Sequence, residues 1–174
     1  MKKVAFIGYG AMAKTVHALL PESIELAWVI VTEAGVAATQ QELGPAVQVI
    51  SHVDDMVGAP DLVLEMAGQA GLKAHAKAVL QRQLPLAVIS VGAFADSVFE
   101  REIREFAVAQ GAQLQILPGA IAGVDGIAAA RTMGLDSVVY QGRKKPASWK
   151  GSYAEQLVDL DALTQATVFF RGSA

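Results

Sequence analysis

The ten residues Val4-Ala-Phe-Ile-Gly-Tyr-Gly-Ala-Met-Ala13 place an apolar run directly before a glycine turn and a segment suited to a helix. Gly8 permits the tight turn, and Gly10 has no side chain to block the approach of a ligand to the backbone. Ala13 is small enough for the helix to pack close to the strand. The spacing G-x-G-x-x-A after a first strand is typical of dinucleotide-binding domains, whose helix N-terminus attracts a pyrophosphate. The stretch therefore predicts a bound dinucleotide.

The same segment also has features of a secretory signal. Lys2-Lys3 is basic, and Ala11-Met-Ala13 has the small residues of a cleavage site. The apolar run Val4–Ile7 is only four residues long, well short of the ~7–15 that such a signal needs, and no later run approaches the ~18 of a membrane span. The chain has no cysteine, which excludes a disulfide framework and a thiolate metal site. We expect a cytoplasmic protein without a membrane partner.

Composition limits the function further. Apolar residues make up 53% of the 174 residues, which favours a large buried core over disorder. The net charge of −3 gives no reason to expect a nucleic-acid partner.

The distribution of cations bears on which dinucleotide binds. No Lys or Arg lies between Lys14 and Lys73, a stretch that holds eight carboxylates. The 2′-phosphate of NADP needs a nearby cation, so this stretch favours NAD. NADP remains possible, because Thr32 and backbone amides could hold a phosphate. An acid that closes the second strand ordinarily binds the adenosine ribose; Glu33 lies slightly past that place, so its role as a ribose ligand is left open.

Apolar strands and helical patterns alternate along residues 1–120. The expected strands are Val4–Ile7, Ile24–Val31, Val47–Ile50, Asp61–Glu65, Leu86–Val91 and Gln113–Leu117. The expected helices are Ala11–Leu20, Gly35–Leu43, Leu72–Arg82 and Ser97–Gln110. Such alternation implies right-handed crossovers and a parallel sheet with helices on both faces. We predict an α/β fold with a doubly wound parallel (Rossmann) sheet as an NAD-binding domain over residues 1–120.

The pattern changes after Pro118. Asp125–Met133 is expected to form a helix with Asp125 as its N-cap and Gly134 as its stop. Ser137–Gln141 and Thr167–Phe170 are rich in β-forming residues. Two strands and a helix do not make a self-sufficient domain. Residues 121–174 are therefore expected to be the start of an incomplete α+β second domain.

Small residues follow three of the expected strands, in the loops 65–71, 90–93 and 117–123. In sheets of this kind, ligands bind outside the carboxyl ends of the strands. Loops built of glycine and alanine at those ends would leave room for a flat ring and a ribose, so they predict a binding surface for the cofactor.

Candidates for proton transfer are few. His17, His52 and His75 are each expected to be packed or surface residues, and Asp96 is expected to cap a helix. No Ser-His-Asp set, carboxylate pair or metal cluster stands out. The sequence therefore predicts no catalytic residue and no metal ligand within the chain.

The chain resembles the L-aspartate dehydrogenase family. The segments that carry the resemblance are 7–13, 90–93, 117–131, 140–149 and 166–174, of which the last three are specific to the family. The resemblance implies oxidative deamination of L-aspartate to iminoaspartate and then oxaloacetate, a role in NAD biosynthesis, and a homodimer. It also implies that a Pro-Lys-Asn segment and the catalytic histidine follow Ala174. The family usually has Gly where this chain has Ala13.

The G-x-G-x-x-A fingerprint, the three loops of small residues and the family resemblance together predict a set of cofactor contacts. The contact near Ala120 is assigned by the resemblance alone. These residues are Gly8, Gly10, Ala11, Met12, Ala13, Thr32, Glu33, Ala67, Gly68, Val91, Gly92, Ala93, Gly119 and Ala120. We expect the 174-residue chain to bind the cofactor and to be inactive alone. The alternatives are a non-catalytic NAD-binding module and an oxidoreductase related to homoserine dehydrogenase or dihydrodipicolinate reductase.

Overall fold

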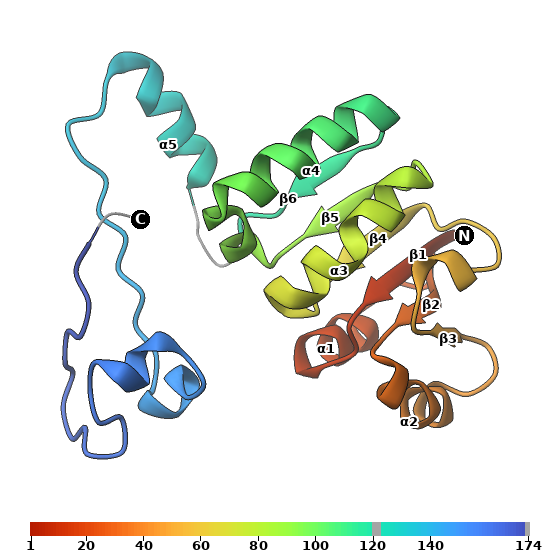
Figure 1. Ribbon diagram of the computed structural model, residues 1–174, viewed down its shortest axis with the longest axis horizontal. Helices are drawn as coiled ribbons and strands as arrows, with labels where there is room; N and C mark the ends of the chain where they lie inside the picture. The colour runs from red at the N-terminus through yellow and green to blue at the C-terminus, as the bar shows by residue number, and fades with distance from the viewer. Residues whose placement is uncertain (120–122, 173–174) are drawn as a thin grey trace. The chain divides into compact units, whose positions relative to one another are not determined.

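Six parallel strands form one sheet in a computed structural model, which describes residues 1–119 and 123–172 (Figure 1). The strands are β1 (Lys2–Ile7), β2 (Ile24–Ile30), β3 (Gln48–Ile50), β4 (Leu62–Glu65), β5 (Leu86–Val88) and β6 (Leu114–Ile116). Their order is β3-β2-β1-β4-β5-β6, and each pair of neighbours is parallel. The chain moves outward from β1 in one direction and then returns to β1's other side for β4. The predicted doubly wound sheet is confirmed.

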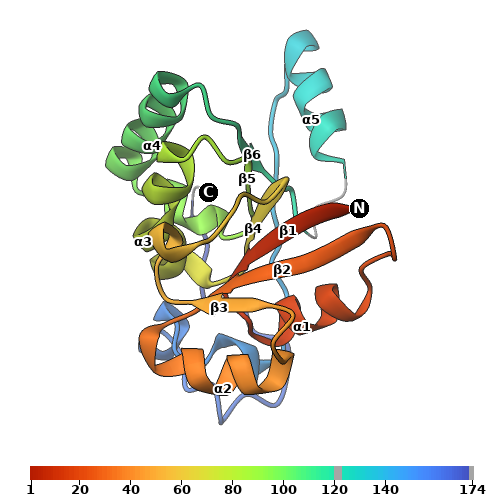
Figure 2. The ribbon, with the colours of Figure 1, turned by 90° about the vertical axis from the view of Figure 1, so that its right-hand side faces the viewer.

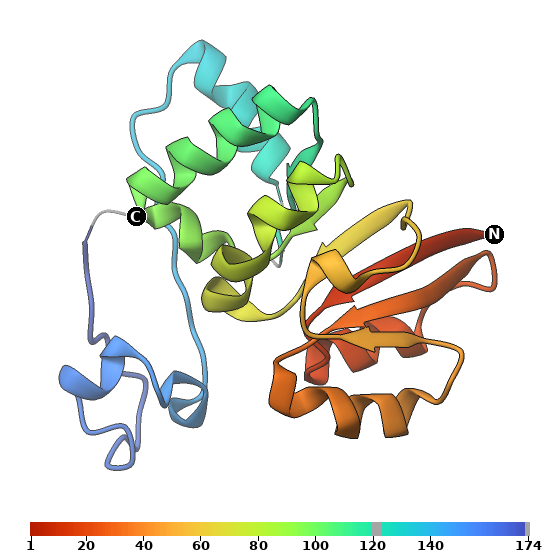
Figure 3. The same cartoon turned by 45° about the vertical axis from the view of Figure 1, so that its right-hand side comes forward.

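Four helices cover the two faces of the sheet. They are α1 (Ala11–Ala18), α2 (Glu33–Leu43), α3 (Gly68–Gln81) and α4 (Ser97–Gln110). Helices α1 and α2 lie on one face, and α3 and α4 lie on the other (Figure 2). Helices α3 and α4 run side by side (Figure 3). The Asp96 carboxylate accepts hydrogen bonds from the first-turn amides of α4, which confirms it as the N-cap.

Strand β1 shows why the sheet is buried on both sides. Val4 and Phe6 pack with Ala13 of α1 on one face, whereas Ala5 and Ile7 pack with the α3 side chains on the other. All four of these side chains are almost fully buried, whereas Lys2 and Lys3 at the start of β1 are exposed. Because successive residues of a strand point to opposite faces, a continuous apolar run is what a central parallel strand needs.

The chain divides into two units, residues 1–122 and 123–174. The second unit contains α5 (Val124–Ala130) and the 3₁₀ turns Arg131–Met133, Pro146–Trp149 and Tyr153–Gln156. The cap of α5 is Gly123 at φ +81°, so the N-cap role expected for Asp125 is wrong; Asp125 lies in the first turn instead. Gly134 ends the helical segment, as expected.

The two strands expected in the second unit are wrong for this structure. Ser137–Gln141 and Thr167–Phe170 are irregular, and residues 123–172 contain no strand. A β-strand is held by hydrogen bonds to a neighbouring strand, and β-rich composition alone supplies no such neighbour. Val139 and Phe170 are accordingly exposed.

Within residues 1–119 and 123–172, none of the helices combines the length and the apolar character that crossing a bilayer would require.

The two fingerprint glycines differ in what holds them, which predicts opposite responses to alanine. Gly8 has φ +91°, and a Cβ there would lie 2.8 Å from the Ala67 Cα and 2.9 Å from the Met66 carbonyl oxygen. Gly10 has φ −81°, and a Cβ there would meet no atom within 4 Å. Gly8→Ala should cost about 2–4 kcal/mol of unfolding free energy through strain and overpacking. Gly10→Ala should cost no more than about 1 kcal/mol, for a less favourable N-cap.

Urea unfolding followed by circular dichroism measures both changes. Equal unfolding midpoints for the two variants would contradict the assignment of Gly8 as the glycine that the fold itself requires.

Candidate functional site

The carboxyl ends of β1 and β4 form the switch point of the sheet. The chain leaves β1 toward α1 on one face and leaves β4 toward α3 on the other. Connections that diverge to opposite faces leave a crevice between them, and in open α/β sheets this crevice is where ligands bind. The β1–α1 turn and the loops after β4 and β5 meet at this edge, as the parallel pairing requires.

The β1–α1 turn is held by its neighbours. The Gly8 amide donates a hydrogen bond to the Ile30 carbonyl oxygen at 2.7 Å, which ties the turn to the end of β2. The Met66 amide donates to the Ile7 carbonyl oxygen at 2.8 Å, which ties the end of β1 to the loop after β4. Ala13 is fully buried against the sheet. The turn is therefore fixed before any ligand arrives.

Gly10 has no such packing reason to be glycine. The space where its side chain would be is open, no side chain caps α1, and no carboxylate lies in the first turn of α1. An uncapped helix N-terminus offers N–H donors and the positive end of the helix dipole to an anion. Ala11 begins the helix, and the side chain of Met12 is exposed beside it. This donor set fits a pyrophosphate.

The loop after β4 lies against this turn. Ala67 contacts Gly8, and its amide donates to the Glu65 carboxylate at 2.8 Å. Gly68 begins α3 at φ +80°, and a Cβ there would meet nothing within 4 Å. The loop therefore combines one tightly packed residue with one open glycine.

The loop after β5 is a 3₁₀ turn over Val91–Ala95, so the fifth strand ends three residues earlier than expected. A Cβ on Gly92 would lie 2.5 Å from the Gln69 Nε2 atom, so this turn touches the first turn of α3. Val91 is exposed, whereas Ala93 is buried in the core.

The residues expected to bind the adenosine ribose lie at the start of α2. Thr32 is the N-cap of α2 but makes no side-chain capping bond, and Glu33 is its exposed first residue. The Lys14 ammonium lies 2.7 Å from the Glu42 carboxylate, so its charge is already paired. Gly119 has φ +62° and an open Cβ position, and Ala120 lies outside the described residues. The cofactor contacts of these residues remain predictions.

Sequence reasoning missed the interaction that joins two of these loops. Glu65 is the only polar or charged side chain among residues 1–119 and 123–172 that is buried. Its Oε1 atom accepts from the Ala67 amide and the Ser90 hydroxyl, each at 2.8 Å, and Oε2 accepts from the Ser90 amide at 3.1 Å. A carboxylate closing an apolar strand was the available signal.

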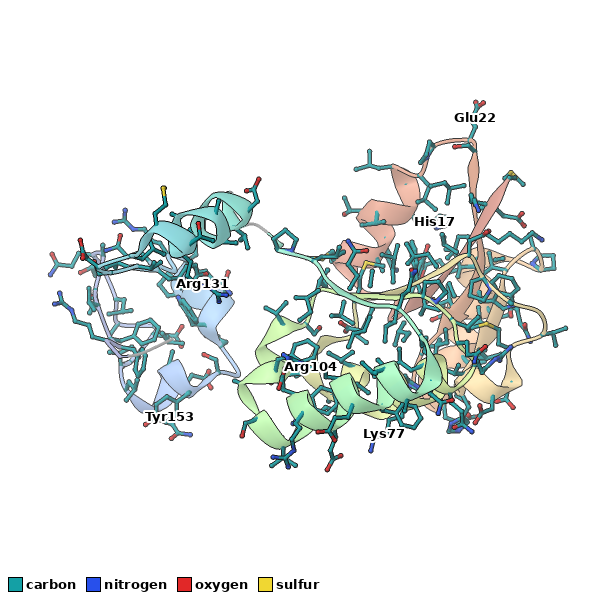
Figure 4. All side chains as sticks on the ribbon, turned by 90° about the horizontal axis from the view of Figure 1, so that it is seen from above. His17, Glu22, Lys77, Arg104, Arg131 and Tyr153 are labelled. Atoms are coloured by element: carbon teal, nitrogen blue, oxygen red, sulfur yellow. The ribbon has the colours of Figure 1, made fainter. Side chains whose placement is uncertain are left out.

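None of the three histidines lies in the β1–α1 turn or in the loops after β4 and β5, which together are called the crevice loops. His17 lies on α1 (Figure 4), and its Nδ1 atom is 2.7 Å from the hydroxyl of Tyr9 in the β1–α1 turn. His75 is half-buried in α3, where burial, and secondarily the nearby His52, lower its pKa. His52 is exposed after β3. In the described part of the chain, no group of three or more His, Asp or Glu side chains could hold a metal ion.

Comparison with known proteins agrees with this geometry. Residues 8–117 match the family model for the homoserine dehydrogenase NAD-binding domain, and residues 125–174 match the model for the aspartate dehydrogenase C-terminal region. A protein of Psychrobacter cryohalolentis named L-aspartate dehydrogenase is 51% identical over all 174 residues. The chain spans 66% of that relative's length.

Two solved structures share the fold. The aspartate dehydrogenase of Thermotoga maritima is 22% identical with a TM-score of 0.55, over 86% of this chain and 66% of that one. The WlbA dehydrogenase of Bordetella pertussis, solved with NADH and UDP-GlcNAcA, is 15% identical with a TM-score of 0.59, over 76% of this chain and 42% of that one. The first unit is thus a Rossmann domain for a nicotinamide cofactor, and the chain belongs to the L-aspartate dehydrogenase family.

Proposed function

We propose that the complete protein is an L-aspartate dehydrogenase that takes part in NAD biosynthesis. The observation that carries the proposal is the open Gly10 position at the uncapped N-terminus of α1, which lies at the switch point of the sheet. The proposal is supported by the 51% identity of the chain to a protein named L-aspartate dehydrogenase. A bound nicotinamide would accept the hydride from the Cα of aspartate, and a general base would take the proton from its amino group, which leaves the imine. The imine of aspartate then hydrolyses to oxaloacetate and ammonia.

The residues of this chain would hold and orient the cofactor. The α1 amides after Gly10 would bind the pyrophosphate, and Glu33 would face the adenosine ribose. Ala67, Gly68 and Val91 would lie under the nicotinamide half. The protein's contribution is position and electrostatics, because the redox chemistry belongs to the cofactor.

A non-catalytic NAD-binding module is the second candidate. It is favoured by the positions of His17, His52 and His75, all of which lie outside the crevice loops. A general base must come within about 2.6–3.2 Å of the proton it removes, directly or through one water. The two candidates agree on cofactor binding and differ on turnover by the complete protein.

The 174-residue chain should bind NADH yet form almost no NADH from NAD and aspartate. We expect its rate to be at least about a thousandfold below that of the complete protein, since none of its three histidines lies in the crevice loops to act as a general base. Binding is measured by NADH fluorescence, and turnover by absorbance with excess aspartate at alkaline pH.

Gly10→Ala tests whether the cofactor binds at this turn, because its methyl group would enter only the open space at the fold's surface. It should weaken NADH binding at least about tenfold while lowering the unfolding free energy by no more than about 1 kcal/mol. Steady NADH formation by the 174-residue chain would place a base within these residues. A complete protein that oxidised malate or homoserine but not aspartate would overturn the family activity.

NAD should bind more tightly than NADP, by about five- to tenfold. Lys14 is paired with Glu42, and the exposed Glu33 carboxylate would repel a 2′-phosphate nearby. Calorimetric titration with both dinucleotides measures the ratio. Glu33→Gln should reduce it and Glu22→Gln, the same change at an exposed site, should not; a tighter NADP isotherm for the unaltered chain would reverse the assignment.

Self-association to a homodimer is also expected. Apolar side chains of the second unit are exposed at Val138, Val139, Val168 and Phe170, and contiguous exposed apolar segments favour association. Light scattering should give about twice the 18.2 kDa of one chain. A single-chain mass at high concentration would count against it.

A cytoplasmic location remains a prediction from composition.

A further inference from the structure

We propose that Glu65 is a positioning residue that fixes the two loops beneath the nicotinamide half of the cofactor. The inference rests on the proposed function, since it assigns Glu65 a part in holding the dinucleotide. Glu65 is the last residue of β4 and lies opposite Val88 of β5 in the sheet register. Its side chain is fully buried at the edge where the crevice opens.

All three hydrogen bonds to the Glu65 carboxylate come from the two loops. The donors are the Ala67 amide on one side and the Ser90 amide and hydroxyl on the other. No lysine, arginine or histidine of the described residues forms an ion pair with it. A buried carboxylate is costly unless it is satisfied, and hydrogen bonds to a charged group are the stronger kind. Glu65 therefore acts as a bridge between loop backbones.

The bridged loops are also packed against their neighbours. Ala67 lies under Gly8, so close that a Cβ on Gly8 would be 2.8 Å from its Cα. Gly92, two residues after Ser90, lies against Gln69 of α3. The three loops are thus joined into one surface by these contacts.

The sheet order assigns this surface to one half of the dinucleotide. The pyrophosphate site is the β1–α1 turn at Gly10, and the adenosine side is β2 with Thr32 and Glu33. A dinucleotide that crosses the switch point must place its other half over β4 and β5. Loss of the Glu65 bridge should therefore disturb the nicotinamide half and spare the adenosine half.

A glutamine cannot replace this carboxylate. Its amide carries one acceptor oxygen and one donor NH₂ group, whereas the Ala67 and Ser90 amides approach opposite oxygens of Glu65. In either orientation of the side chain, the NH₂ group would face an N–H donor. One loop amide would lose its partner although the side chain kept its shape.

The test compares nucleotides that share the adenosine half. In the 174-residue chain, Glu65→Gln should raise the Kd for NADH about tenfold and change the Kd for ADP less than twofold, as measured by calorimetric titration. Glu22→Gln is the matched control, because Glu22 is exposed in the connection between α1 and β2, with its side chain pointing into solvent (Figure 4). It should leave both constants unchanged.

Two variants at Ser90 give a milder version of the same test. They decide whether the Glu65 bridge affects NADH binding if Glu65→Gln does not fold. Ser90→Ala removes one donor and should raise the NADH Kd about threefold, while Ser90→Thr keeps the hydroxyl and should restore it. Equal losses for ADP and NADH, or no loss for either, would overturn the role of Glu65 and leave the proposed function standing. An unaltered chain that bound neither nucleotide would instead overturn the proposed function.

Discussion

The contact between Gly8 and Ala67 is the constraint on which the crevice depends. It brings the turn after β1 against the loop after β4, at the point where the order in which strands are added to the sheet changes direction. The Met66 amide and the Ile7 carbonyl oxygen hold the same two segments together by a hydrogen bond. With this approach fixed, α1 and α3 diverge to opposite faces, and the open Gly10 position lies at the N-terminus of α1. A side chain at residue 8 would push the two strand ends apart.

The sheet could be predicted from sequence because each of its strands carries its own signal. Val4–Ile7 is apolar throughout and Ile24–Ile30 is apolar except for Glu25, which is what a strand covered on both faces requires. Asp96 and Gly111 bound α4 by local chemistry, one as a cap and the other in the left-handed region. The expected boundaries differ most at the start of α3, which begins at Gly68, and at the end of β5, which stops before Val91; small residues there are compatible with either regular structure or loop.

The parts that could not be predicted depend on contacts distant in the sequence. Ser137–Gln141 has β-forming composition, but the partner that would make it a strand is not encoded in the segment itself. Glu65 and Ser90 are 25 residues apart and meet only because β4 and β5 are neighbours in the sheet. The glycine fingerprint is local and was found; the carboxylate bridge is tertiary and was not.

The position of β1 in the middle of the sheet has a consequence for folding kinetics. Val4 pairs with Leu62, so this ladder closes a long loop and raises the contact order of the domain, which slows folding. On the ribosome the glycine turn is synthesised before Ala67, which follows only after the whole β1–β3 half. That half can form its own ladders first. The crevice is thus completed only when Ala67, which follows the whole β1–β3 half in the chain, packs against Gly8.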